Sequence, residues 1–290
     1  MKNKTTVGIT ACSDALDIKR KEQVESLEAE LIEMGCTIKK SPYLFANGTP
    51  FSTRAEEKGR ILNDLFRDGS VREIFDISGG DLANEVIPYI DIAAVSGSNA
   101  RFWGYSDLTS IINAIYAKTG RASVLYQVRN ILEKNKEKLH NALIYGDDEL
   151  FCPPVSFVNG EEMSGVLVGG NIRCFLKLAG TEYFPDVTGK IVILESLGGG
   201  EARICSMLTQ LEMLGVFEKA SGVLLGTFTE LFKNVGNSAA IELISDRIMK
   251  TSPGIPIAFT ELIGHGKDSL AVLIGKYAVV NRENGKVSYL

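Results

Sequence analysis

His265 has the side chain of a general base, and Glu195 has that of a carboxylate that could orient it. Glu195 directly follows the apolar run 191–194, and His265 lies between two glycines after the apolar strand 256–259. A carboxylate at the end of a buried strand lies at a sheet edge, where it can hold a histidine by a hydrogen bond. Histidine titrates near neutrality and can accept a proton from a nucleophile. Each residue also has an ordinary reading, as an exposed loop glutamate and a structural histidine.

A turn that could present a nucleophile lies in residues 74–91, IFDISGGDLANEVIPYID. An apolar strand leads into a glycine pair and then into a helix, whose first amides are unpaired. Hydrolases place a nucleophile and oxyanion-binding amides in this geometry, although a plain strand-to-helix turn has the same spacing. Here the helix starts at Ala83, whose methyl group is inert. Ser78 and Asp81 are the nearest possible substitutes, and neither occupies the elbow position.

These residues are positioned by an alternation of strands and helices, which predicts an α/β fold with a mostly parallel sheet in the first half. We expect an N-terminal domain over 1–140, a linker over 141–155 and a C-terminal domain over 156–290. The expected helices are 20–34, 53–66, 108–118 and 203–214, with an amphipathic segment over 122–140. The expected strands are 6–11, 74–77, 165–168, 174–178, 190–194, 222–225 and 256–259, before a terminal hairpin over 271–290.

The composition is that of a packed globular protein, with 45% hydrophobic and 23% charged residues among 290. The net charge of −5 and the scattered basic residues argue against nucleic acid as a partner. The start of the chain lacks a long apolar stretch, and no later run is long enough to span a bilayer, so we expect a cytoplasmic protein. Five widely spaced cysteines and two histidines favour neither a metal site nor a cofactor.

Short motifs follow one another in a fixed order along almost the whole chain. A Gly-Gly-x-x-Ala-Asn turn at 79–84 precedes Ile-Pro-Tyr-Ile-Asp at 87–91, and Gly-Tyr-Ser-Asp-Leu-Thr follows at 104–109. Gly-Gly-Asn stands at 169–171 and Gly-Thr at 180–181, with Glu195 and His265 beyond them. This order resembles the LD-carboxypeptidase family of serine peptidases, which includes muramoyl-tetrapeptide carboxypeptidases and microcin-immunity peptidases.

The resemblance implies a flavodoxin-like or glutamine-amidotransferase-like N-terminal domain, a smaller swivelling β/α C-terminal domain, and an active site between them. It implies cleavage of the L,D-amide bond of peptidoglycan peptides such as the murein tetrapeptide, without metal or cofactor, by a homodimer. His265 would be the general base, Glu195 its orienting partner, and the amide of Asn84 part of the oxyanion hole. Substrate-binding positions would be Gly80, Asp81, Ser106 and Asn171.

The chain departs from the family pattern at several positions. Ala83 stands where the resemblance places the nucleophilic serine, which predicts little or no activity. A Gly-Pro pair is replaced within 125–130, a Leu-Pro-x-Gly motif reads 272–275 as Val-Leu-Ile-Gly, and Ser196 replaces a carboxylate. Several departures favour a natural divergent branch over a single serine replaced to trap a peptide. The alternative function is an inactive member that binds muropeptides or related amide-linked compounds.

Overall fold

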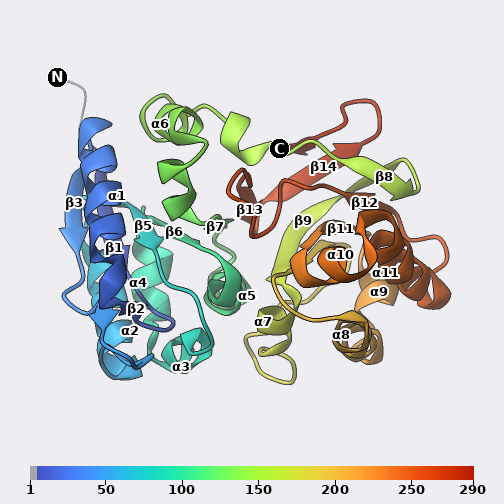
Figure 1. The fold of residues 1–290 in the computed structure, drawn as a ribbon, viewed down its shortest axis with the longest axis horizontal. Helices are drawn as coiled ribbons and strands as arrows, with labels where there is room; N and C mark the ends of the chain where they lie inside the picture. Colours follow the sequence, from blue (N-terminus) through green and yellow to red (C-terminus); the bar gives the residue numbers. More distant parts are fainter. Residues whose placement is uncertain (1–4) are drawn as a thin grey trace.

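A computed structural model describes residues 5–290 and has a six-stranded sheet in its N-terminal half (Figure 1). Across this sheet the strand order is β13-β7-β6-β5-β1-β3. Five of the six strands of this sheet are parallel to one another: β1 (Thr6–Thr10), β3 (Thr37–Lys40), β5 (Val71–Asp76), β6 (Arg101–Gly104) and β7 (Ser123–Leu125). All five residues of β1 are buried, as expected for a central parallel strand covered on both faces.

The helices of this half confirm the three long ones that periodicity predicts. The helices that match the predictions are α1 (Lys21–Glu33), α2 (Ala55–Arg67) and α5 (Thr109–Thr119). The others in this half are α3 (Ala83–Val86), α4 (Ile92–Gly97) and α6 (Lys136–Ile144). Gly35 and Gly120 follow α1 and α5 with φ of 90° and 68°, left-handed conformations that glycine adopts readily and that end a helix. The predicted amphipathic segment 122–140 is wrong as one element, because β7 and a 3-10 turn precede α6.

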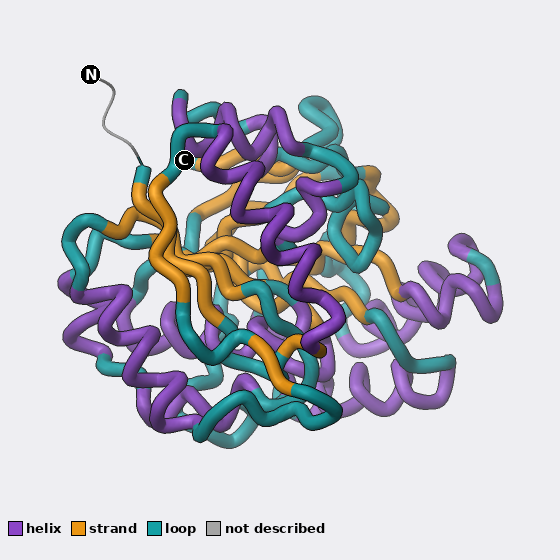
Figure 2. Tube along the Cα trace, turned by 60° about the vertical axis from the view of Figure 1, so that its left-hand side comes forward, coloured by secondary structure: helices purple, strands orange, loops and turns teal. Residues whose placement is uncertain are grey.

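A seven-stranded sheet forms the centre of the second half, in the order β15-β14-β9-β10-β11-β12-β8. Its strands are β8 (Ser156–Asn159), β9 (Glu162–Asn171), β10 (Ile191–Ser196), β11 (Gly222–Phe228), β12 (Ile257–Phe259), β14 (Tyr277–Asn281) and β15 (Val287–Tyr289). Its helices are α7 (Ile172–Leu176), α8 (Glu201–Met213), α9 (Val216–Lys219), α10 (Thr229–Val235) and α11 (Asn237–Thr251). Figure 2 shows the strands in the interior and helices around them.

The structure corrects two predictions for the second half. Residues 174–178, expected as a strand, lie at α7 and just beyond it, and Asn171 accepts a hydrogen bond from the amide of Cys174 at the start of this helix. The predicted terminal hairpin is formed by β14 and β15 alone. Its expected first part, β13 (Val272–Ile274), instead pairs antiparallel with β7 and completes the first sheet. The end of the chain therefore ties the two halves together.

A small parallel pair, β2 (Leu16–Asp17) with β4 (Phe45–Ala46), lies outside both sheets. Within residues 5–290, no helix is both long enough and apolar enough to cross a bilayer. The first four residues, on which the expected absence of a leader segment partly depends, lie outside the described part of the chain.

Candidate active site

Glu195 and His265, far apart in sequence, meet at the carboxyl ends of the strands of the second sheet. Glu195 is the fifth residue of β10 and is fully buried, whereas His265 lies in the loop after β12. Nδ1 of His265 is 2.9 Å from Oε2 of Glu195, a hydrogen-bond distance. Nε2 of the same ring is buried and has no partner in residues 5–290. The carboxylate thus fixes the ring by one nitrogen and leaves the other available.

Ser106 has the conformation of a residue at a sharp strand-to-helix turn. It follows β6 and Tyr105, begins the 3-10 turn Ser106–Leu108 and precedes α5. Its φ is 56°, a left-handed value that among the described non-glycine residues is shared only with Asn135. Such backbone costs about 1–3 kcal/mol and persists only where the surroundings impose it, often at functional sites. The ring of Tyr105 packs edge-on against His265, with centroids 4.9 Å apart.

One cavity contains both Ser106 and His265. It has a volume of about 470 Å³. Its walls come from the loop after β1, the glycine turn after β5, the serine turn after β6 and the segment after β7: Asp14, Ala15, Leu16, Asp17, Arg20, Ile77, Ser78, Gly79, Gly80, Tyr105, Ser106, Gln127, Arg129 and Asn130, with Leu197 and Gly264 opposite. The carboxyl ends of neighbouring parallel strands meet at one sheet edge, which brings these loops together.

The glycine turn is shaped to approach this cavity closely. A Cβ on Gly79 would be 4.0 Å from Cβ of Ser106, in ordinary contact. Gly80 has φ of 135°, and a Cβ there would lie 2.2 Å from Cγ of Asp14. Oδ1 of Asp14 accepts from the amides of Asp81 and Leu82, at 2.8 and 3.2 Å. Only glycine fits at position 80, and the turn is held rigidly beside Ser106.

Ala83, predicted to stand at the elbow of the turn after β5, lies in the core instead of at the cavity. It is the first residue of α3, its side chain is fully buried in the hydrophobic core, and it is absent from the cavity lining. Its amide donates to Oδ2 of Asp107 at 2.8 Å. A methyl group suits this position because the site is apolar. Asn84, whose amide was predicted to be part of the oxyanion hole, is exposed within α3 and also lies outside the lining.

Ser78 lines the cavity, but its hydroxyl is already engaged. Its Oγ donates to Oδ1 of Asp76 at 2.5 Å and accepts from the amide of Ser13 at 2.9 Å. Burial raises the pKa of Asp76, an effect that hydrogen bonds from Ser78 and Cys12 partly offset. Ser78 thus braces the turn after β5, with its hydroxyl held between the Asp76 carboxylate and the amide of Ser13.

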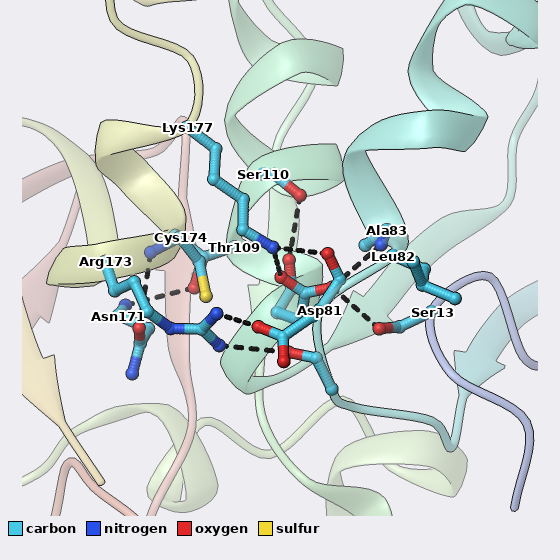
Figure 3. Close-up of polar contacts among 12 residues, drawn as sticks. Ser13, Asp81, Leu82, Ala83, Thr109, Ser110, Asn171, Arg173, Cys174 and Lys177 are labelled. Carbon is cyan, nitrogen blue, oxygen red and sulfur yellow. Dashed lines mark hydrogen bonds and ion pairs between the residues drawn. The ribbon is translucent and has the colours of Figure 1, made fainter. Parts of the chain in front are cut away.

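A buried ion pair holds the glycine and serine turns to the second half of the chain. The fully buried carboxylate of Asp107 accepts from Nζ of Lys177 at 2.5 Å, from Oγ of Ser13 at 2.7 Å and from Ala83. Lys177 also donates to the carbonyl of Asp81 at 2.7 Å. Figure 3 shows Arg173 and Lys177 reaching from α7 and just beyond it toward this turn.

Two predicted substrate-binding residues lie at this contact instead of in the cavity. Asp81 is exposed and forms an ion pair with Arg173. Asn171 is buried, and its amide donates to Oγ1 of Thr109 at 3.0 Å. Neither is in the cavity lining, whereas Gly80 and Ser106, the other two predicted positions, are.

Asp107, which holds the two turns, and Arg129, which lines the cavity, were not predicted from the sequence, and Ser106 was predicted only as a binding residue. A signal for Ser106 was present, since residues 101–119 also read as a strand, a glycine-containing turn and a helix. Arg129 lies in the segment 125–130 where the chain departs from the family pattern. Within residues 5–290, no group of three or more His, Cys, Asp or Glu side chains is arranged to hold a metal ion.

Comparisons with known proteins agree with this architecture. Residues 7–126 match the LD-carboxypeptidase N-terminal domain and residues 164–280 match the LD-carboxypeptidase C-terminal domain. A probable murein peptide carboxypeptidase of Bacillus subtilis is 27% identical over 288 residues, which cover 95% of this chain and 88% of the relative.

Two solved structures share the fold. A muramoyltetrapeptide carboxypeptidase from Oxalobacter formigenes superimposes with a TM-score of 0.78 at 22% identity, covering 98% of this chain and 97% of the other. The microcin C7 self-immunity protein MccF, in complex with glutamyl sulfamoyl guanosine, superimposes with a TM-score of 0.87 at 17% identity, covering 100% of this chain and 96% of the other.

Proposed function

Because the chain belongs to the LD-carboxypeptidase family, we propose that it is an active serine hydrolase whose nucleophile is Ser106 and not the residue at position 83. Its substrate is the L,D-amide bond of peptidoglycan-derived peptides such as the murein tetrapeptide. One observation carries this proposal. Ser106, whose backbone is in the left-handed conformation, lines the same cavity as His265, and Nδ1 of His265 is hydrogen-bonded to Glu195.

The chemistry follows the logic of a serine, histidine and acid triad. Oγ of Ser106 attacks the carbonyl carbon of the scissile amide while Nε2 of His265 takes the hydroxyl proton. Glu195 accepts a hydrogen bond from Nδ1–H and stabilises the imidazolium that forms. His265 then protonates the leaving amine of the D-amino acid, and the C–N bond breaks to leave an ester on Ser106. Water, deprotonated by His265, hydrolyses that ester.

The developing oxyanion needs amide donors in the two turns. The amide of Asp107 directly follows the nucleophile at the start of a 3-10 turn, where helix amides lack internal partners. The turn at Gly79 and Gly80 supplies a second backbone beside Ser106. Removing one such donor in a hydrolase costs about 10²- to 10³-fold in kcat.

The substrate class is supported by the names of the relatives, which include a probable murein peptide carboxypeptidase and a muramoyltetrapeptide carboxypeptidase. We further propose that the protein acts in the cytoplasm as a homodimer, without metal or cofactor. Cell fractionation and light scattering on the purified protein test the first two. Activity after exhaustive chelation tests the third.

Two substitutions distinguish the nucleophile assignments. Each variant is incubated with murein tetrapeptide, and released D-alanine is measured by mass spectrometry. Ser106→Ala should lower kcat by at least about 10³-fold, because the attacking oxygen is lost. Ala83→Ser should give no gain over the parent chain, since position 83 is buried outside the cavity.

An active parent chain whose Ser106→Ala variant keeps full activity would contradict the assignment. So would an inactive parent that gains activity as Ala83→Ser. Saturable binding of the tetrapeptide by calorimetry with no turnover by any variant would support the alternative, an inactive binding protein.

A further inference from the structure

Arg129 is a cationic side chain at the cavity that no acidic group neutralises. It lies in the 3-10 turn Val128–Leu132 after β7 and lines the same cavity as Ser106 and His265. Its Nε donates to Oε1 of Gln127 at 3.1 Å, and it forms no ion pair within residues 5–290. This neutral contact leaves most of its guanidinium donors without a fixed anionic partner.

A second arginine adds to the positive charge. Arg20, the last residue of the 3-10 turn Ile18–Arg20 after β2, lines the cavity and likewise has no ion pair in the described part of the chain. Burial, followed by repulsion from Arg20, lowers the pKa of Arg129 to about 10, so the Arg129 side chain is still charged at neutral pH. A partly buried guanidinium beside another is unfavourable until an anion joins them.

The nearby carboxylates do not supply that anion. Asp76 attracts Arg129 weakly, but its oxygens accept from the amides of Cys12 and Ser78 at 2.7 and 2.9 Å. Asp14 is bound to amides of the glycine turn, and Asp17 accepts from the amide of Lys19 at 2.9 Å. The cavity is therefore built to receive a negative group from a ligand.

We propose that Arg129, assisted by Arg20, binds the C-terminal carboxylate of the D-amino acid that leaves the substrate. The inference rests on the proposed hydrolysis at Ser106. A planar guanidinium matches a carboxylate in two parallel hydrogen bonds, which fixes its orientation as well as its charge. Such a contact restricts cleavage to the last amide bond, because an internal residue has no carboxylate at that place.

The test compares two peptides that differ in one group. Murein tetrapeptide with a free terminal D-alanine and the same peptide ending in D-alanine amide are given to the parent chain and to Arg129→Gln. Arg60→Gln, a change on the exposed face of α2, is the control. Circular dichroism verifies folding of each variant.

For the free acid, Arg129→Gln should lower kcat/KM by about 10- to 100-fold, mostly through KM, the loss expected for a charge-assisted hydrogen bond. The amide peptide should be a poorer substrate of the parent chain by a similar factor and should respond less than about threefold to the substitution. Arg129→Lys should recover part of the loss. Equal losses on both peptides would overturn the carboxylate contact.

Calorimetry on the Ser106→Ala variant separates this contact from the chemistry. Tighter binding of the acid than of the amide, lost in Ser106→Ala with Arg129→Gln, supports the subsite even if the parent chain hydrolyses neither peptide. Equal binding of acid and amide refutes the subsite and leaves the hydrolase proposal standing. If neither peptide binds and neither is cleaved, both proposals fail.

Discussion

Replacing Lys177 by methionine should destabilise the protein through the buried charge that it leaves behind. Its ammonium is 2.5 Å from the carboxylate of Asp107, which is fully buried, while the lysine side chain is only 18% exposed. Removing one partner of a buried pair typically costs about 3–5 kcal/mol. Asp107 retains hydrogen bonds from Ser13 and Ala83, so we expect the lower end, about 3 kcal/mol.

The assay is urea unfolding followed by circular dichroism, with Lys136→Met as the matched control. Lys136 pairs with Glu33 at 3.0 Å and with Glu30, and the three side chains are 44%, 72% and 30% exposed, respectively. Such surface pairs contribute about 0–1 kcal/mol. The Lys177 variant should therefore lose clearly more stability than the Lys136 variant.

A second substitution identifies the cause of the loss. If the unpaired carboxylate of Asp107 is responsible, adding Asp107→Asn to Lys177→Met should restore about 1–2 kcal/mol, because the uncompensated charge is removed. A Lys177 variant as stable as the Lys136 control would refute the reasoning. So would a double variant less stable than Lys177→Met alone.

Two further predictions concern the cavity walls. Glu195→Gln should lower kcat by about 10³- to 10⁴-fold, which raises the activation free energy by about 4–5.5 kcal/mol, because the neutral amide no longer stabilises the imidazolium or fixes the tautomer of His265. Single-turnover kinetics measures this loss, and a loss below tenfold would count against the triad. Gly80→Ala should cost about 1–3 kcal/mol of stability and most of the activity, because φ is 135° and the new methyl group would clash with Asp14. The control Gly69→Ala, where no atom lies within 4 Å of the new Cβ, should change stability by no more than about 0.5 kcal/mol. Thermal unfolding compares the two variants, and equal effects would contradict the argument.

The sequence by itself determined the α/β class, the longer helices and the pair Glu195 and His265, which the structure brings together. Glu195 and His265 could be found because apolar runs mark where strands end, and strand ends meet at a sheet edge. The order of the motifs was likewise enough to identify the family. These features depend on residue type and local spacing, which are visible without coordinates.

Only the tertiary structure showed that Ser106 lines the cavity with His265 and that Ala83 does not. Both 74–91 and 101–119 read as strand, turn and helix, and residue types do not reveal that Ser106 has a positive φ or that position 83 is packed in the core. Segment 174–178 was predicted as a strand but lies at α7, and segment 272–274 was predicted in the terminal hairpin but pairs with β7. The structure of such short apolar segments depends on contacts with distant strands and helices. Ala83, the feature that suggested inactivity, lies in the core, and Ser106, which we propose as the nucleophile, follows the next strand of the sheet.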